Sequence, residues 1–210
     1  MTSKTQQHWQ TVYTSKDAQA VSWFSPRLGI SLRLLEQAGL DAQSHVIDIG
    51  GGASTLVDDL LDRGIAHVSV LDLSAAALRV AQQRLGDRAN RVEWFVADIA
   101  KADLPRAAFD IWHDRAVLHF LTGKAAADAY VRLASTALRP GGYAVIGGFA
   151  SDGPDTCSGL PVARRDAADI AALFGADFEL VDQAREVHTT PSGSVQPFAY
   201  ALLRRRASAG

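Results

Sequence analysis

A glycine turn between two short apolar runs limits the folds that this chain can adopt more than any other feature of the sequence. The first run ends at Asp48, and the turn that follows covers residues 50–52, all of them glycine. Residues 55–62 then have helical spacing, and the second run ends at Asp72, 20 residues after Gly52. This order of strand, glycine turn, helix, strand and terminal acid is typical of a nucleoside-binding βαβ unit.

The turn also discriminates between classes of nucleotide-binding protein. Glycine lacks a Cβ, so its backbone can approach a ligand closely, and an acid at the tip of the second strand can accept hydrogen bonds from both ribose hydroxyls. The dinucleotide fingerprint requires a further glycine where this chain has Thr55. A P-loop requires Gly-Lys-Ser/Thr at the start of the helix, which the sequence lacks. The turn therefore disfavours an NAD(P)-dependent oxidoreductase and a P-loop protein.

Length and composition predict one globular domain. The 210 residues are 48% hydrophobic and 21% charged, which suits a chain with a full hydrophobic core. The net charge of −2 argues against nucleic acid as a partner, because phosphate binding requires a basic face. The single cysteine, Cys157, fits a reducing compartment, and residues 1–7 lack the apolar core of a signal peptide. No apolar run approaches about 18 residues, so we expect a cytoplasmic protein without membrane contacts.

Alternating strands and helices predict an α/β fold with a doubly wound, mainly parallel seven-stranded sheet that ends in a C-terminal antiparallel hairpin. The predicted strands cover residues 45–47, 67–71, 92–96, 109–113, 143–149, 178–187 and 197–203. The predicted helices cover residues 7–13, 30–38, 55–62, 75–85, 125–138 and 167–174. We expect a single domain (1–210) in which residues 1–42 form a helical cap or lid, 43–203 form the Rossmann-like core, and 204–210 form a frayed tail.

From about residue 43 to 203, the order of elements resembles that of class I S-adenosylmethionine (SAM) methyltransferases. Residues 48–52 (Asp-Ile-Gly-Gly-Gly) match the first motif of that family, and residues 70–74 and 97–99 match the second and third. Residues 138–142 (Leu-Arg-Pro-Gly-Gly) match its common turn before the fifth strand. The resemblance implies SAM as cofactor, S-adenosylhomocysteine as product, and a cofactor site formed by Asp48, Gly50, Gly51, Gly52, Asp72, Leu73, Asp98 and Ile99.

The segment before the first strand resembles that of a subgroup that includes eukaryotic protein-lysine methyltransferases. The matching residues are His8, Trp9, Tyr13 and the stretch 21–24 (Val-Ser-Trp-Phe). The eukaryotic lysine enzymes usually carry Asp-Lys-Gly-Thr after the fourth strand, whereas residues 113–120 here are His-Asp-Arg-Ala-Val-Leu-His-Phe. This difference favours another kind of acceptor.

Side chains at the carboxyl edge of the sheet are the candidates for the acceptor site. His113, Asp114 and His119 follow the fourth strand, where open α/β sheets bind ligands, and are the candidate catalytic residues. A surface pair of Asp114 with Arg115 is the alternative for that segment.

Trp23, Cys157 and His188 are the candidate substrate-binding residues, with an ordinary core aromatic and a buried inert thiol as alternatives for the first two. As a group, the N-terminal aromatic residues suggest a lid over the reacting methyl group. One cysteine and scattered histidines lack the spacing of a zinc site, so we expect no metal.

Methyl transfer to a small soluble acceptor is the favoured function. A protein-lysine methyltransferase and a non-catalytic SAM-binding module are the alternatives, and a protein acceptor stays possible. The identity of the acceptor, its nucleophilic atom (N, O or S), the need for a general base and the oligomeric state do not follow from the sequence.

Overall fold

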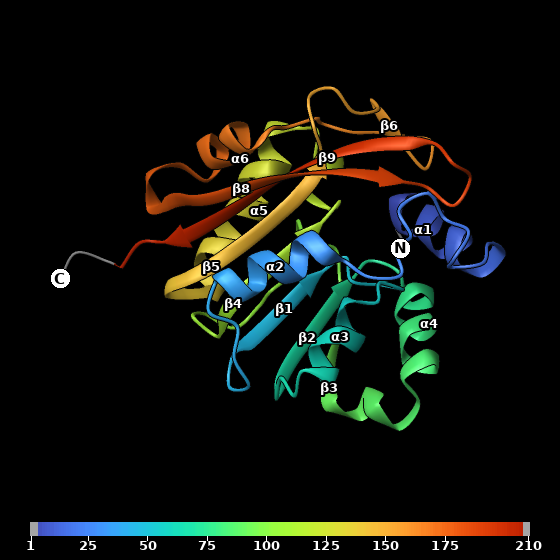
Figure 1. Cartoon of the computed structure of the whole chain (residues 1–210), viewed down its shortest axis with the longest axis horizontal. Helices are drawn as coiled ribbons and strands as arrows, with labels where there is room; N and C mark the ends of the chain where they lie inside the picture. Colours follow the sequence, from blue (N-terminus) through green and yellow to red (C-terminus); the bar gives the residue numbers. More distant parts are fainter. Residues whose placement is uncertain (1–3, 208–210) are drawn as a thin grey trace.

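The computed structural model describes residues 4–207, and within them seven strands form the main sheet. These strands are β1 (His45–Ile49), β2 (His67–Asp72), β3 (Val92–Val96), β4 (Phe109–Arg115), β5 (Leu138–Phe149), β8 (Phe178–Thr189) and β9 (Val195–Arg205). The strand order is β3-β2-β1-β4-β5-β9-β8. β1 to β5 pair in parallel, whereas β9 is antiparallel to both β5 and β8 (Figure 1). The predicted seven-stranded sheet with a terminal antiparallel hairpin is confirmed.

Helices and short turns connect these strands. The helices are α1 (Lys4–Ser15), α2 (Gly29–Gln37), α3 (Leu56–Asp62), α4 (Ala75–Leu85), α5 (Lys124–Ala137) and α6 (Ala167–Phe174). The 3₁₀ turns are η1 (Gly86–Arg91), η2 (Leu118–Phe120) and η3 (Gly175–Asp177), and the loop after β5 contains a small hairpin of β6 (Thr156–Cys157) and β7 (Leu160–Pro161).

The core consists of two apolar layers, one on each face of the sheet. Side chains alternate along a strand, so Val46 packs with α2, α3 and α4 on one face, while Ile47 packs with α5 and α6 on the other. Tyr130 of α5 and Phe174 of α6 are among the buried residues of the second layer. Strands covered on both faces need apolar residues at nearly every position, which explains the short continuous apolar runs in the sequence.

The two halves of the sheet diverge from β1, which pairs with β2 on one side and β4 on the other. Ligands of open α/β sheets bind at the carboxyl ends of the strands beside such a reversal of strand order. In Figure 1, α1 lies beside α4 near the carboxyl ends of β1 and β2. The N-terminal segment therefore covers the edge of the sheet where a ligand is expected.

Several predicted boundaries change in the structure. β9 continues through Arg205, and the backbone amide of Arg206 donates to the carbonyl of Asp177 at 2.8 Å. The frayed tail predicted from residue 204 is therefore wrong at its start, and residues 208–210 lie outside the described part. The turn predicted at residues 138–142 forms the first part of β5, with Gly141 at φ 85°. β4 also runs two residues further than predicted, to Arg115.

Candidate active site

A cavity of about 390 Å³ lies at the carboxyl ends of β1, β2 and β4, within the range of small-molecule sites. One wall comes from the strand ends and the residues that follow them: Ile49, Gly50, Asp72, Leu73, Asp98 and Ile99. The opposite wall comes from α1, the segment after it, η2 and the β6–β7 hairpin: Trp9, Tyr13, Trp23, Phe120 and Cys157. The cavity therefore joins the predicted cofactor residues to the predicted lid.

The glycine turn is required by contacts within the protein. Gly50 has φ 67°, and a Cβ at this position would overlap the Cγ2 of Val117 in the turn after β4. A Cβ at Gly52 would lie 2.6 Å from the Oδ2 of Asp72. Glycine at these positions lets the first turn pack closely against the β4 turn and leaves room for the carboxylate of Asp72.

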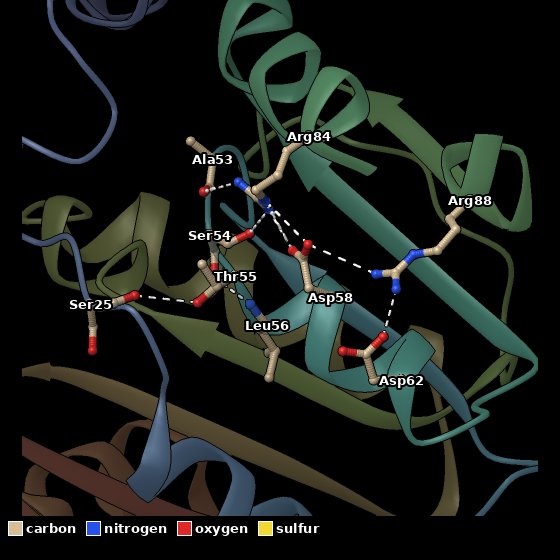
Figure 2. Close-up of polar contacts among 9 residues, drawn as sticks. All are labelled: Ser25, Ala53, Ser54, Thr55, Leu56, Asp58, Asp62, Arg84 and Arg88. Atoms are coloured by element: carbon tan, nitrogen blue, oxygen red, sulfur yellow. Dashed lines mark hydrogen bonds and ion pairs between the residues drawn. The ribbon is translucent and has the colours of Figure 1, made fainter. Parts of the chain in front are cut away.

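Arg84 of α4 holds the end of the glycine turn, as Figure 2 shows. Its Nη1 donates to the carbonyl of Ala53 at 2.9 Å, and its Nη2 donates to the carbonyl of Ser54 at 2.6 Å. The same guanidinium pairs with Asp58 of α3 at 2.6 Å. Local sequence patterns give no sign of this role of Arg84, because its partner Ser54 is 30 positions away in the chain.

Asp72 lies at the cavity wall with its side chain almost fully buried. The backbone amide of Ser74 donates to its Oδ1 at 2.7 Å, and the relative exposure of the residue is 8%. Burial raises the pKa of Asp72 to about 7, and the neighbouring carboxyl of Asp48 contributes to this rise, while the amide of Ser74 opposes it. The position at the tip of β2 is the one predicted for a ribose-binding acid.

Asp48 lies beside a smaller pocket that adjoins the main cavity, and Gly51, Ser54 and Arg115 also border this pocket. The ring Nδ1 of His113 is 2.6 Å from Asp48 Oδ1, and the Ser31 hydroxyl is 2.8 Å from the other ring nitrogen. The Oδ2 of Asp48 is buried without a hydrogen-bond partner in residues 4–207. A buried carboxylate oxygen needs a donor, so this atom can receive an ammonium group.

His113 therefore positions Asp48, and the structure does not bring the other two catalytic candidates to the cavity. The carboxylate of Asp114 accepts hydrogen bonds from the amides of Val117 and Leu118 and from the hydroxyl of Tyr130, at 2.6–3.0 Å. Burial raises the pKa of Asp114 to about 6. This carboxylate holds the η2 turn in place from outside the walls of the cavity.

His119 is also buried behind the cavity wall. Its ring packs against Phe120 and Phe149, and its Nδ1 accepts from the amide of Phe149 at 3.5 Å. Burial lowers the pKa of His119 to about 3, and the positive charges of Arg115 and Arg165 lower it further. The imidazole therefore stays neutral, with no contact to the cavity through which it could take a proton from an acceptor.

Two of the three substrate-binding candidates line the cavity. Trp23 and Cys157 line it. Burial raises the pKa of the Cys157 thiol to about 12, so the thiol stays protonated. His188 does not line the cavity: its Nε2 donates to the carbonyl of Ser22 at 2.8 Å. This bond ties the β8 strand to the segment that carries Trp23.

The N-terminal aromatic residues form one cluster over the cavity. The ring of Trp9 lies 5.5 Å from that of Trp23 and 5.2 Å from that of Phe120, both edge to face. The Nε1 of Trp23 donates to the hydroxyl of Tyr13 at 3.1 Å. The oxygen of Gln10 in α1 accepts from Ala76 at the start of α4, at 2.8 Å, which anchors the helix beside the cavity.

Arg115, which the alternative interpretation placed on the surface in a pair with Asp114, is buried in the wall of both pockets, with 6% of its side chain exposed. Its Nε donates to the hydroxyl of Tyr200 and its Nη1 to the carbonyl of Trp23, both at 3.0 Å. The surface pair is therefore wrong, because β4 extends to residue 115 and directs this segment into the protein.

Comparison with known proteins agrees with this architecture. Residues 46–142, from β1 to the start of β5, match the methyltransferase domain family. The match covers slightly less than half of the chain, and the sheet as a whole has the fold of class I methyltransferases. An uncharacterised methyltransferase of Mycobacterium tuberculosis is 38% identical to the chain over 76 residues, which make up 36% of this chain and only 37% of that protein.

Solved structures resemble the domain over most of its length. A protein described for the conversion of a disulfide bond into a thioacetal group in echinomycin biosynthesis has a TM-score of 0.76 at 20% identity, covering 96% of this chain and 92% of that one. The 1,6-didemethyltoxoflavin-N1-methyltransferase of Burkholderia thailandensis, solved with S-adenosylhomocysteine, has a TM-score of 0.71 at 22% identity, covering 96% and 87%. At these identities the likeness shows the shared fold.

SAM is the cofactor of class I methyltransferases, and the residues of this domain fit it. Asp72 would hold the ribose, and Leu73 and Ile99 would border the adenine. Asp98, whose Oδ1 already accepts from the amide of Ala100 at 3.1 Å, would accept from the adenine amino group. The unpartnered Oδ2 of Asp48 would receive the ammonium of the methionine part.

Proposed function

We propose that this protein transfers a methyl group from SAM to a small acceptor held in the main cavity. The observation that carries the proposal is that one cavity borders both the nucleoside-binding residues and the aromatic cluster of Trp9, Trp23 and Phe120. An acceptor between them would lie next to the methyl group. SAM supplies the reactive carbon, so the protein has to align the acceptor and exclude water.

The covering of the cavity supports a small acceptor over a protein lysine. A lysine side chain needs a channel open to the surface, whereas Trp9 and Tyr13 of α1 form part of the wall of this cavity. Asp114, the acid that could have stood at the floor of such a channel, is occupied by the η2 amides and by Tyr130. The similar fold of a methyltransferase that acts on 1,6-didemethyltoxoflavin, a small molecule, is consistent with this preference.

Binding and turnover separate the proposal from its alternatives. We expect S-adenosylhomocysteine to bind the purified chain by calorimetry, and radiolabelled SAM to label a compound in the dialysable fraction of a lysate. Label that enters only macromolecules would favour the protein-lysine alternative. Binding with no labelled product in either fraction would favour a non-catalytic SAM-binding module, and NADH binding without SAM binding would overturn the assignment of cofactor. The cytoplasmic location and the lack of a nucleic-acid partner stay predictions.

A further inference from the structure

The acceptor end of the cavity contains a buried cation with an unused donor. The Nη2 of Arg115 is buried without a hydrogen-bond partner in residues 4–207. The closest carboxylate oxygen, Oε2 of Glu186, is 3.7 Å away, beyond hydrogen-bond distance, and already accepts from the Tyr200 hydroxyl at 2.6 Å. A buried donor on a charged group gains much from an acceptor, and gains most from an anion.

The guanidinium is also held in a fixed position. Tyr200 and the carbonyl of Trp23 accept from its other nitrogens, and its central carbon lies 4.3 Å from the centroid of the Phe198 ring. A guanidinium fixed in this way can recognise a carboxylate or a ring oxyanion without first becoming ordered.

The walls around this cation are aromatic. Trp9, Trp23 and Phe120 border the same cavity and contact one another edge to face at 5.2–5.5 Å. Aromatic walls bind flat aromatic ligands through stacked and edge-to-face contacts. A flat ring and a negative charge are therefore the two features that this end of the cavity can recognise.

This end also lacks a side chain that could take a proton. Within the described residues, the titratable side chains that line the cavity are Tyr13, Asp72, Asp98, Lys101, Arg115 and Cys157. The two acids belong to the cofactor side, and Lys101 is exposed next to Asp98. Burial raises the pKa of the Tyr13 hydroxyl, and it raises that of the Cys157 thiol to about 12, so both stay protonated. An acceptor must therefore bring a lone pair that is already free.

We propose, on the basis of the proposed function, that the acceptor is a flat aromatic compound bound as its anion, with Arg115 as the residue that selects the negative charge. In the reaction, a lone pair of the acceptor anion forms the bond to the methyl carbon while the bond from that carbon to sulfur breaks. The bonding electrons go to sulfur, which becomes a neutral thioether, and the acceptor loses its negative charge. No proton has to leave the acceptor within the site.

The experiment compares two probes of the same shape, 2-naphthoate and its uncharged analogue 2-naphthamide. Both are titrated by calorimetry into the full chain saturated with S-adenosylhomocysteine. We expect naphthoate to bind about tenfold or more tightly than naphthamide, because a buried hydrogen bond to a charged group is worth at least that factor. In Arg115→Gln, the ratio of the naphthoate affinity to the naphthamide affinity should fall to near one. Arg132→Gln, which removes an exposed charge on α5, should leave it unchanged.

The outcomes distinguish this inference from the proposed function. Failure of S-adenosylhomocysteine to bind would count against the proposed function. If it binds, but naphthoate binds no better than naphthamide or not at all, only the selection of an anion is wrong. The ratio of the two probe affinities in the wild-type protein decides whether the site selects an anion, even if Arg115→Gln fails to fold. If the variant weakens S-adenosylhomocysteine binding and leaves the probe ratio unchanged, Arg115 serves the cofactor carboxylate and the inference is overturned.

Discussion

The carboxyl group of Asp72 should lose a proton when a nucleoside binds at or below neutral pH. Burial raises its pKa to about 7 in the ligand-free protein, whereas ribose hydroxyls donate best to the ionised form. Ligand binding near neutral pH should therefore release a proton. Below about pH 7 the affinity should fall, by up to about tenfold for each pH unit, and above it the affinity should level off.

Adenosine tests this prediction, because it lacks the amino acid group of the cofactor. Calorimetry between about pH 6 and about pH 8 should show tighter binding at the higher pH. Asp72→Asn should weaken binding roughly ten- to a hundredfold at the higher pH and remove the pH dependence. If the affinity of the variant changed with pH as much as that of the wild type, a group other than Asp72 would be responsible for the pH dependence.

Among the elements, α4 supports the glycine turn through a single side chain. Arg84 holds the carbonyls of Ala53 and Ser54 and pairs with Asp58 (Figure 2). Arg84→Gln should cost about 1–3 kcal/mol of unfolding free energy and weaken S-adenosylhomocysteine binding, since the turn loses its charged donor. Arg79→Gln removes an exposed charge from the same helix and is the matched control. Equal binding by the two variants would show that the turn keeps its shape without Arg84.

α1 should be separable from the core. Neither apolar layer of the sheet contains a residue of α1 among its buried members, although Trp9 and Tyr13 line the cavity. Deletion of residues 1–16 should therefore leave a folded chain by circular dichroism. It should bind S-adenosylhomocysteine about tenfold more weakly and transfer methyl groups poorly, because one cavity wall is lost. If the shortened chain does not fold, α1 is needed for the core and is not separable from it.

For the whole molecule, His119 should govern part of the stability in acid. Burial lowers its pKa from 6.5 to about 3, so the folded chain keeps the ring neutral while the unfolded chain protonates it. The contribution of the neutral His119 ring to the free energy of unfolding is complete above about pH 6.5. It is lost as the pH falls towards about 3, by up to about 1.4 kcal/mol for each pH unit.

Urea unfolding of the wild type and of His119→Gln across this pH range checks the prediction. The difference in unfolding free energy between the two proteins should be constant above about pH 6.5 and shrink as the pH falls. Asp72 and Asp114, whose pKa values are raised, act in the opposite direction in both proteins and cancel in the difference. A difference that does not change with pH would show that the fold does not lower the pKa of His119.

The sequence by itself determined the order of elements, the sheet class and the residues proposed to bind the cofactor. Strand and helix periods, the glycine turn and the acid at the end of β2 are properties of neighbouring residues, so they can be recognised along the chain. Asp72, Leu73, Asp98 and Ile99 lie in the cavity wall, as the motifs predict.

Only the tertiary structure decided which side chains converge at the acceptor end. Asp114 lies within β4 and His119 within η2, and both side chains are buried in the core, while Arg115 at the end of β4 enters the cavity wall. Arg84 and Gln10 reach partners 26 to 66 positions away. Side-chain direction at the end of a strand and pairing over such separations depend on the packing of whole elements, which no local pattern encodes.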